Sequence, residues 1–170
     1  ISTVVGRYFA MDRDHRWERI QVAYDALVSG IGETTNDLLN SIQISHARKE
    51  TDEFIKPLIL AGAPRVNDND AVIFFNYRID RPRELTRALS IVGDDYAKQK
   101  ESFDPYSVKY HHSHLTQSVG NQGFVRSKVL QNVCMVTMTE YEKTLPVEIA
   151  FPPEFVEMPL SRVIALSGRR

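Results

Sequence analysis

The sequence predicts an α/β fold, a sheet with helices on both faces. AVIFFNYR, residues 71–78, opens with five consecutive apolar residues. A run without polar alternation is typical of a strand covered on both sides. Residues 79–89, IDRPRELTRAL, follow at once and predict a helix with Pro82 near its first turn. A strand, a short turn and a helix in this order make the unit from which α/β sheets are built.

The first 50 residues predict one strand and two helices. Residues 1–5 are rich in β-branched side chains, which favours a short strand. Apolar residues recur at helical spacing over residues 17–28, and Gly30 is a natural helix end. Residues 38–42 predict a second helix, with Thr35 as its candidate cap.

The rest of the chain predicts further strands and one more helix. Residues 56–62, KPLILAG, favour a short strand or a buried loop, and residues 129–141 return to strand. Between them, residues 93–128 are polar, lack sustained periodicity and predict a long excursion. The two prolines in residues 150–157 are typical of a hinge, and residues 159–168 predict a short helix that stops at a glycine.

Composition excludes several classes of protein. The 170 residues suit one domain, and 42% hydrophobic with 25% charged residues is ordinary for a globular chain. A formal net charge of −1 argues against a general nucleic-acid or membrane-surface binder. No apolar run approaches the ~18 residues of a membrane span, and a single cysteine excludes an internal disulfide. We therefore expect a cytoplasmic protein, and its ends, at Ile1 and after LSGRR, suggest a piece of something longer.

Arg78 and Arg81 form the strongest candidate site. Arg78 ends the predicted central strand and Arg81 begins the following helix. Ligands of open α/β sheets bind beyond the carboxyl ends of the strands, and helix N-termini attract anions. Two guanidinium groups there suit a phosphate or a carboxylate. The alternative is an exposed turn whose arginines pair with Asp80 and Glu84, and spacing alone leaves both interpretations open.

The stretch GRYFAMDRDHRWER repeats this arrangement. Arg7 and Arg13 again lie between a predicted strand and a predicted helix, where Asp12 and Asp14 could orient them. Alone, this stretch would favour a solvated turn. Two similar basic turns in a near-neutral chain strengthen the case for an anion site, and both interpretations stay open. The other two arginines of the stretch are expected on the solvent face of the helix: Arg16 and Arg19.

Other reactive residue types give weaker signals. The cluster of His111, His112 and His114 could ligate a metal, but adjacent histidines in a polar loop are more often solvated. His15 and His46 have no evident partners in the sequence. We expect no metal site in this segment.

Nucleophilic catalysis has little support. Cys134 lies in an apolar strand and is expected to be an inert core thiol. No GxSxG elbow or glycine-rich phosphate loop is present. Glu140, Glu142 and Lys143 follow a strand, where a charged loop is favoured over a general acid or base. The chain is thus expected to bind an anion without carrying the groups that transform it.

Four stretches of the sequence closely resemble the cofactor-independent (2,3-bisphosphoglycerate-independent) phosphoglycerate mutases: GRYFAMDRDHRWERIQVAYDALV, ETDEFIKP, FFNYRIDRPRELTRAL and TMTEYEKTLPVEIAFPPE. The resemblance runs in order over most of the chain and is weakest across residues 93–128. It implies an isomerase of glycolysis that interconverts 3-phosphoglycerate and 2-phosphoglycerate through a phosphoserine intermediate. It also implies two divalent metal ions, commonly manganese, and a phosphatase-like domain of the alkaline phosphatase superfamily, interrupted by an inserted substrate-binding domain.

The resemblance also implies where this segment lies in such an enzyme. The family's metal ligands, its nucleophilic serine and its early substrate-domain motifs have no counterpart in these residues. We expect residues 1–150 to form the later part of an incomplete substrate-binding domain. Residues 151–170 are then a hinge and a short return into the metal-binding phosphatase-like domain. The arginines that match those of the family are, for the carboxylate end, Arg7 and Arg13 and, for the phosphate, Arg78 and Arg81.

On this interpretation the segment alone is inactive and carries no catalytic residue. The parent enzyme is expected to be a monomer that binds phosphoglycerate, with no nucleic-acid or membrane partner. Two alternatives remain. One is a free-standing, non-catalytic anion-binding module of the same fold. The other is a related phosphomutase acting on a sugar phosphate, which the glycerate-type motifs disfavour.

Overall fold

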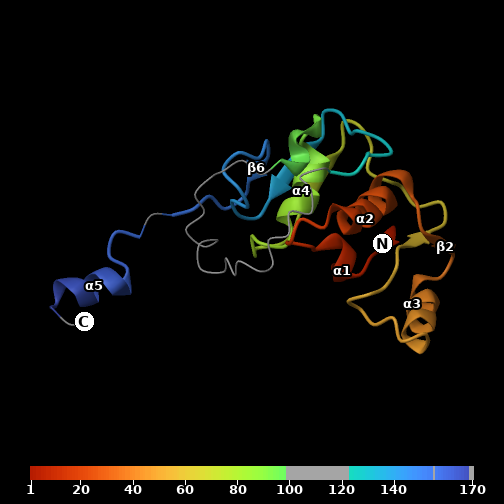
Figure 1. The fold of residues 1–170 in the computed structure, drawn as a ribbon, viewed down its shortest axis with the longest axis horizontal. Helices are drawn as coiled ribbons and strands as arrows, with labels where there is room; N and C mark the ends of the chain where they lie inside the picture. Colours follow the sequence, from red (N-terminus) through yellow and green to blue (C-terminus); the bar gives the residue numbers. More distant parts are fainter. Residues whose placement is uncertain (99–122, 155, 169–170) are drawn as a thin grey trace.

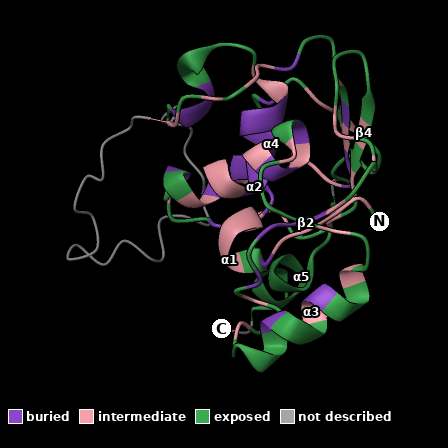
Figure 2. Cartoon of the chain, turned by 90° about the vertical axis from the view of Figure 1, so that its right-hand side faces the viewer, coloured by how far each residue is buried: buried purple, intermediate pink, exposed green. Residues whose placement is uncertain are grey.

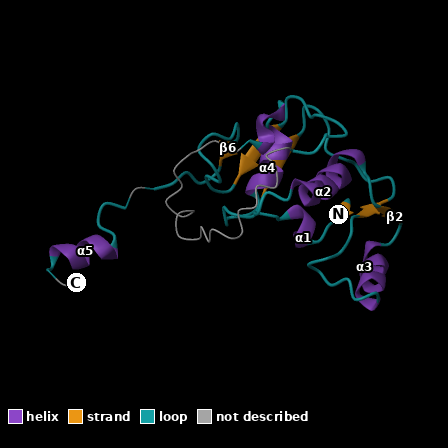
Figure 3. Cartoon of the chain, viewed as in Figure 1, coloured by secondary structure: helices purple, strands orange, loops and turns teal. Residues whose placement is uncertain are grey.

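The computed structural model describes residues 1–98, 123–154 and 156–168. Within them, helices pack against two small sheets of three strands each (Figure 1). The α/β class that the sequence predicts is confirmed. Figure 3 shows how much of the remaining chain is loop, especially around the strand ends.

The first sheet combines strands from the N-terminal third of the chain. Strand β1 (Thr3–Val4) pairs antiparallel with β3 (Leu58–Leu60), and β2 (Glu33–Thr35) pairs parallel with β3 on its other side. The strand order is β1-β3-β2. Of the two alternatives for residues 56–62, the strand is therefore correct.

Helix α3 (Leu38–Ala47) follows β2 and contacts β3. Its cap is Asp37, whose carboxylate accepts a hydrogen bond from the Asn40 backbone N–H at 3.1 Å. Thr35, the predicted cap, lies two residues earlier and accepts from the Asp37 N–H at 3.0 Å. The prediction of Thr35 was wrong because two side chains share the turn, and the aspartate is the one that reaches the helix.

Helices α1 (Arg7–Ala10) and α2 (Trp17–Ser29) lie side by side after β1. The predicted helix over residues 17–28 is confirmed. It ends at Gly30, whose φ of +68° is the left-handed conformation that glycine adopts without steric cost. A Cβ atom at this position would also lie 2.8 Å from the Arg65 Nε.

The second sheet is parallel throughout. Its strands are β4 (Ala71–Phe74), β5 (Cys134–Thr137) and β6 (Glu148–Ile149), in the order β4-β5-β6. Helix α4 (Arg83–Ser90) follows β4 and the 3₁₀ helix η1 (Asp94–Ala97) follows α4. The predicted strand, turn and helix of residues 71–89 are confirmed in this order.

The main hydrophobic core lies between α2, α4 and the second sheet. In Figure 2 the buried stretches of the two helices lie next to each other. Trp17 at the start of α2 and Leu85 at the start of α4 are both 4% exposed. The other buried members of this core come from both helices, η1 and the strand region: Ile20, Tyr24, Val28, Ala88, Leu89, Tyr96, Ala97, Leu130 and Met135.

Strand β4 differs from its prediction. Val72 and Phe74 pack on the core, but Ile73 is 65% exposed and Phe75, directly after the strand, is 76% exposed. Within the described residues β4 is an edge strand, and the core covers only its Val72 side. The prediction of a strand covered on both faces was therefore wrong. Cys134, predicted to be a core thiol, is exposed at the start of β5.

The C-terminal segment stands apart from both sheets. Helix α5 (Leu160–Leu166) confirms the helix predicted for residues 159–168, and Figure 1 shows it away from the rest of the chain. All described residues from 151 to 168 are exposed. Among the described helices, none is both long enough and apolar enough to cross a membrane.

We expect Gly30→Ala to lower the free energy of unfolding by about 1–2 kcal/mol, because alanine adopts the left-handed conformation at a steric cost. Urea denaturation of the chain measures the change. Gly93→Ala is the matched control, since Gly93 has no positive φ and no atom within 4 Å of an added Cβ. Equal stability of the two variants would contradict the assignment of Gly30.

Candidate functional site

The two basic turns meet at the N-terminal ends of α2 and α4. Arg13 lies in the turn before α2, and its Nη1 donates a hydrogen bond to Asp80 Oδ2 at 2.8 Å. Arg81, just before α4, donates from Nη1 to the main-chain oxygen of Met11 at 3.0 Å. Both contacts join segments that are far apart in the sequence, so the fold itself brings the two turns together.

Asp80 also binds Arg78. Its Oδ1 accepts from Arg78 Nε at 2.6 Å and its Oδ2 accepts from Arg78 Nη2 at 3.0 Å. Burial raises the pKa of the Asp80 carboxyl, but the hydrogen bonds from Arg78 and Arg13 outweigh burial, and the pKa lies below its ordinary value. Two arginines, one from each basic turn, thus share one ionised carboxylate. The expected pairing of the turn arginines with Asp80 occurs for Arg78, whereas Glu84 is buried.

Arg7 lies at the other end of α1 with a partner of its own. Its Nη2 donates to Glu53 Oε2 at 2.9 Å. Its main-chain oxygen accepts from the Met11 N–H at 2.9 Å, so the backbone of α1 connects it to the Arg81 contact. Among the described residues, no side-chain hydrogen bond joins Arg7 to the other three arginines.

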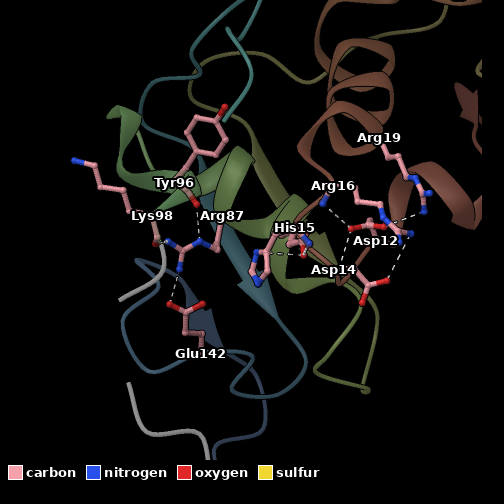
Figure 4. A network of polar contacts seen from close by, with 10 residues as sticks. Asp12, Asp14, His15, Arg16, Arg19, Arg87, Tyr96, Lys98 and Glu142 are labelled. Atoms are coloured by element: carbon pink, nitrogen blue, oxygen red, sulfur yellow. Dashed lines mark hydrogen bonds and ion pairs between the residues drawn. The ribbon is translucent and has the colours of Figure 1, made fainter. Parts of the chain in front are cut away.

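Asp12 shapes the turn before α2. It is 5% exposed, and its Oδ2 accepts from the backbone N–H groups of Asp14 at 2.9 Å and Arg16 at 3.0 Å. Its Oδ1 accepts from Arg19 Nη1 at 3.2 Å, as Figure 4 shows. Arg19 also lies over the Tyr8 ring at 3.8 Å, which corrects its expected place on the solvent face. The prediction that Asp12 and Asp14 orient the site arginines was wrong, because Asp12 accepts from the backbone of its own turn and from Arg19, and Asp14 pairs with Arg16.

Glu84 is a buried carboxyl beneath these turns. It lies in the first turn of α4, is 2% exposed, and its Oε1 accepts from the His15 N–H at 2.9 Å. Within the described residues its Oε2 has no hydrogen-bond partner. Burial raises its pKa to about 7, and the charges of Asp12 and Asp14 act in the same direction. Burial favours the neutral form of His15 as well, and it therefore lowers the pKa of the His15 imidazole. Near pH 7 a largely neutral imidazole therefore faces a carboxyl that is partly protonated.

Arg87 is a structural residue that the sequence analysis missed. Its Nη1 donates to Glu142 Oε1 at 2.6 Å, with both side chains nearly buried. Its Nε donates to the Tyr96 main-chain oxygen at 2.6 Å, and its Nη2 donates to the main-chain oxygens of Asp95 and Lys98 (Figure 4). Glu142 is therefore the partner of Arg87 in an ion pair. The two roles considered for it from the sequence, a charge in a solvated loop and a general acid or base, do not describe it. Helical spacing places Arg87 on the side of α4 opposite Leu85 and Leu89, so no pattern in the sequence indicated this role.

The histidines do not assemble a metal site in the part of the chain that the structure describes. No group of three or more His, Cys, Asp or Glu side chains there could hold a metal ion. His46, which had no evident partner in the sequence, binds Asp52 Oδ1 at 2.7 Å. The predicted cluster lies outside the described residues: His111, His112 and His114.

The arrangement can bind an anion. The side chains of Arg13 and Arg78 are 46% and 73% exposed, so a ligand can reach them. In the described structure, Arg78 Nη1 and Arg13 Nη2 make no hydrogen bond, which leaves donors for carboxylate or phosphate oxygens. The N-terminal ends of two helices add positive potential at the same place.

Comparisons with known proteins agree on one family. The family model described as the BPG-independent PGAM N-terminus matches residues 1–143. The 2,3-bisphosphoglycerate-independent phosphoglycerate mutase of Thermomicrobium roseum is 42% identical over 175 residues, covering 100% of this chain and 28% of the relative. The corresponding protein of Chloroflexus aurantiacus is 42% identical over 181 residues, covering 100% of this chain and 31% of the relative. The chain thus spans about three tenths of the length of these relatives.

A solved structure shows the same fold. Leishmania mexicana phosphoglycerate mutase, studied at low cobalt concentration, superposes with a TM-score of 0.66 at 23% sequence identity. The match covers 99% of this chain and 28% of that chain.

We expect Glu84→Gln to remove a pH dependence of stability. The folded-state pKa of Glu84 is raised from 4.5 to about 7, so its contribution is fully present below pH 4.5 and is lost as the pH rises through about 7. One pKa unit corresponds to about 1.4 kcal/mol, so the loss is on the order of 3–4 kcal/mol. Chemical denaturation between pH 4 and pH 8 measures it, with the exposed Glu18→Gln as control. Parallel pH profiles for Glu84→Gln and the wild type would contradict this account.

Proposed function

Because the chain belongs to the family of BPG-independent phosphoglycerate mutases, we propose that it is part of an isomerase that interconverts 3-phosphoglycerate and 2-phosphoglycerate. The parent enzyme transfers the phosphoryl group through a phosphoserine intermediate in glycolysis. This segment supplies the arginines that hold the substrate. The observation that carries the proposal is the meeting of Arg13, Arg78 and Arg81 at the ends of α2 and α4.

The substrate has two anionic ends, and the proposal assigns two arginines to each. Arg7 and Arg13 grip the carboxylate, while Arg78 and Arg81 contact the phosphate. The shared contact of Arg13 and Arg78 with Asp80 supports this, because it puts one member of each pair at the same carboxylate. The backbone of α1 keeps Arg7 close to the same turn.

The two pairs have different tasks in this mechanism. A phosphoryl group in transfer spreads negative charge over its oxygens, and guanidinium groups already in position stabilise that charge without reorganising. The carboxylate pair keeps the freed glycerate bound while it reorients. The phosphate can then return to a different oxygen before water intercepts it.

The proposal places the metal chemistry elsewhere in the parent. The described residues do not fit a metal centre, so the two divalent ions, which we propose to be manganese, would be bound by other parts of the enzyme. We propose that residues 1–150 belong to the substrate-binding domain and that residues 151–170 lead back into the phosphatase-like domain. The exposure of the described residues from 151 to 168 supports a hinge there. We further propose that the parent enzyme is a cytoplasmic monomer without nucleic-acid or membrane partners.

Arginine substitutions in the intact parent enzyme test the assignment. Arg78→Ala and Arg81→Ala should each lower kcat/KM by about 30-fold to 1,000-fold, since one charged contact to the phosphoryl group contributes about 2–4 kcal/mol of transition-state stabilisation. ³¹P NMR of the conversion of 3-phosphoglycerate measures the rate. Arg16→Ala is the matched control, because Arg16 lies in the same basic turn and its only side-chain ion pair among the described residues is with Asp14 at 3.7 Å.

Near-normal activity of both alanine variants would show that Arg78 and Arg81 do not contact the phosphate. A wild-type parent that binds phosphoglycerate without converting it would instead favour a non-catalytic binding module.

A further inference from the structure

Asp80 contacts two of the proposed substrate arginines, one from each basic turn. Arg78 precedes it by two residues and approaches through Nε and Nη2. Arg13 comes from the turn before α2 and approaches through Nη1. One carboxylate therefore receives three N–H donors from the two basic turns.

The orientation of both arginines depends on this carboxylate. In the described part of the chain, the guanidinium groups of Arg13 and Arg78 make no other hydrogen bond. Their side chains are 46% and 73% exposed, so packing restrains them little. Arg7 and Arg81 differ, because each has a separate acceptor in Glu53 and in the main chain of Met11.

Electrostatic repulsion between the two arginines also makes their arrangement depend on Asp80. Two guanidinium groups that approach one place repel each other unless an anion lies between them. Asp80 is that anion throughout the neutral pH range, since its pKa is lowered despite its burial. It engages the donors that face it and leaves Arg78 Nη1 and Arg13 Nη2 for other oxygen atoms.

We infer that Asp80 is a positioning residue that holds Arg13 and Arg78 in a common arrangement before the substrate binds, an inference that rests on the proposed function of these arginines. Asp80 does not contact the reacting atoms. It acts through the arginines, by restricting long exposed side chains that would otherwise have to be ordered by the substrate itself. The opposite role, a carboxylate that competes with the substrate for the guanidinium groups, would make its removal strengthen anion binding.

Asp80→Asn in the intact parent enzyme separates these roles, because asparagine keeps the shape and loses the charge. We expect KM for 3-phosphoglycerate to rise at least tenfold, with a smaller change in kcat. The inhibition constant of inorganic phosphate should rise in parallel. Asp14→Asn is the matched control: it removes the same charge from the other basic turn, its carboxylate pairs only loosely with Arg16, and KM should stay within twofold. Unchanged or tighter phosphate binding by Asp80→Asn would overturn the inference.

The outcomes distinguish the inference from the proposed function. If the wild-type parent converts phosphoglycerate and Asp80→Asn has a normal KM, the function stands and the inference fails. If the wild type shows no conversion but binds phosphate by calorimetry, and Asp80→Asn weakens that binding, the function fails and the inference stands.

If Asp80→Asn does not fold, a measurement on the wild-type enzyme tests the inference instead. The Nε–H group of Arg78 should give a distinct ¹⁵N NMR signal that exchanges with water at least tenfold more slowly than the Nε–H of Arg16. Exchange as fast as that of Arg16 would show that Asp80 does not hold Arg78.

Discussion

The packing of α2 against α4 is the constraint on which the rest of the structure depends. Trp17 and Leu85, each in the first turn of its helix, are buried in the same core. The N-terminal ends of both helices therefore lie close together, and the turn before each helix carries its arginines to the same place. The hydrophobic effect is not directional, but by packing α2 against α4 it determines where the arginine side chains meet.

Three acidic residues lie around the two basic turns, each in a different environment. Asp12 accepts hydrogen bonds from two backbone N–H groups in the turn before α2. Asp80 is an ionised group between two arginines. Glu84 is buried, with a pKa near 7, and supports the His15 backbone. The same functional group therefore accepts from the backbone of a turn in Asp12, is a counter-ion in Asp80 and is partly protonated near pH 7 in Glu84. The balance between burial and hydrogen bonds from arginine separates Asp80 from Glu84.

Local rules predicted much of this fold, and long-range contacts account for what they missed. Helical spacing and Gly30 were sufficient for α2, and Pro82 with Leu85 and Leu89 for α4, because these signals act within a few residues. The positions of the four arginines between strands and helices also follow from local order. The sharing of Asp80, the burial of Glu84 and the Arg87–Glu142 ion pair depend on tertiary contacts that no local pattern contains. An apolar run such as 71–75 shows what a strand could bury, but not how much of it the neighbouring chain covers.

The exposed C-terminal segment has a mechanical consequence. The last backbone hydrogen bond that ties it to the second sheet runs from the Phe151 N–H to the Met138 oxygen at 3.0 Å. Pro152 and Pro153 follow, and neither has an N–H to donate. Among the described residues beyond them, α5 makes hydrogen bonds only within its own neighbourhood. A rotation of α5 about the prolines would therefore break none of the hydrogen bonds that join the two basic turns.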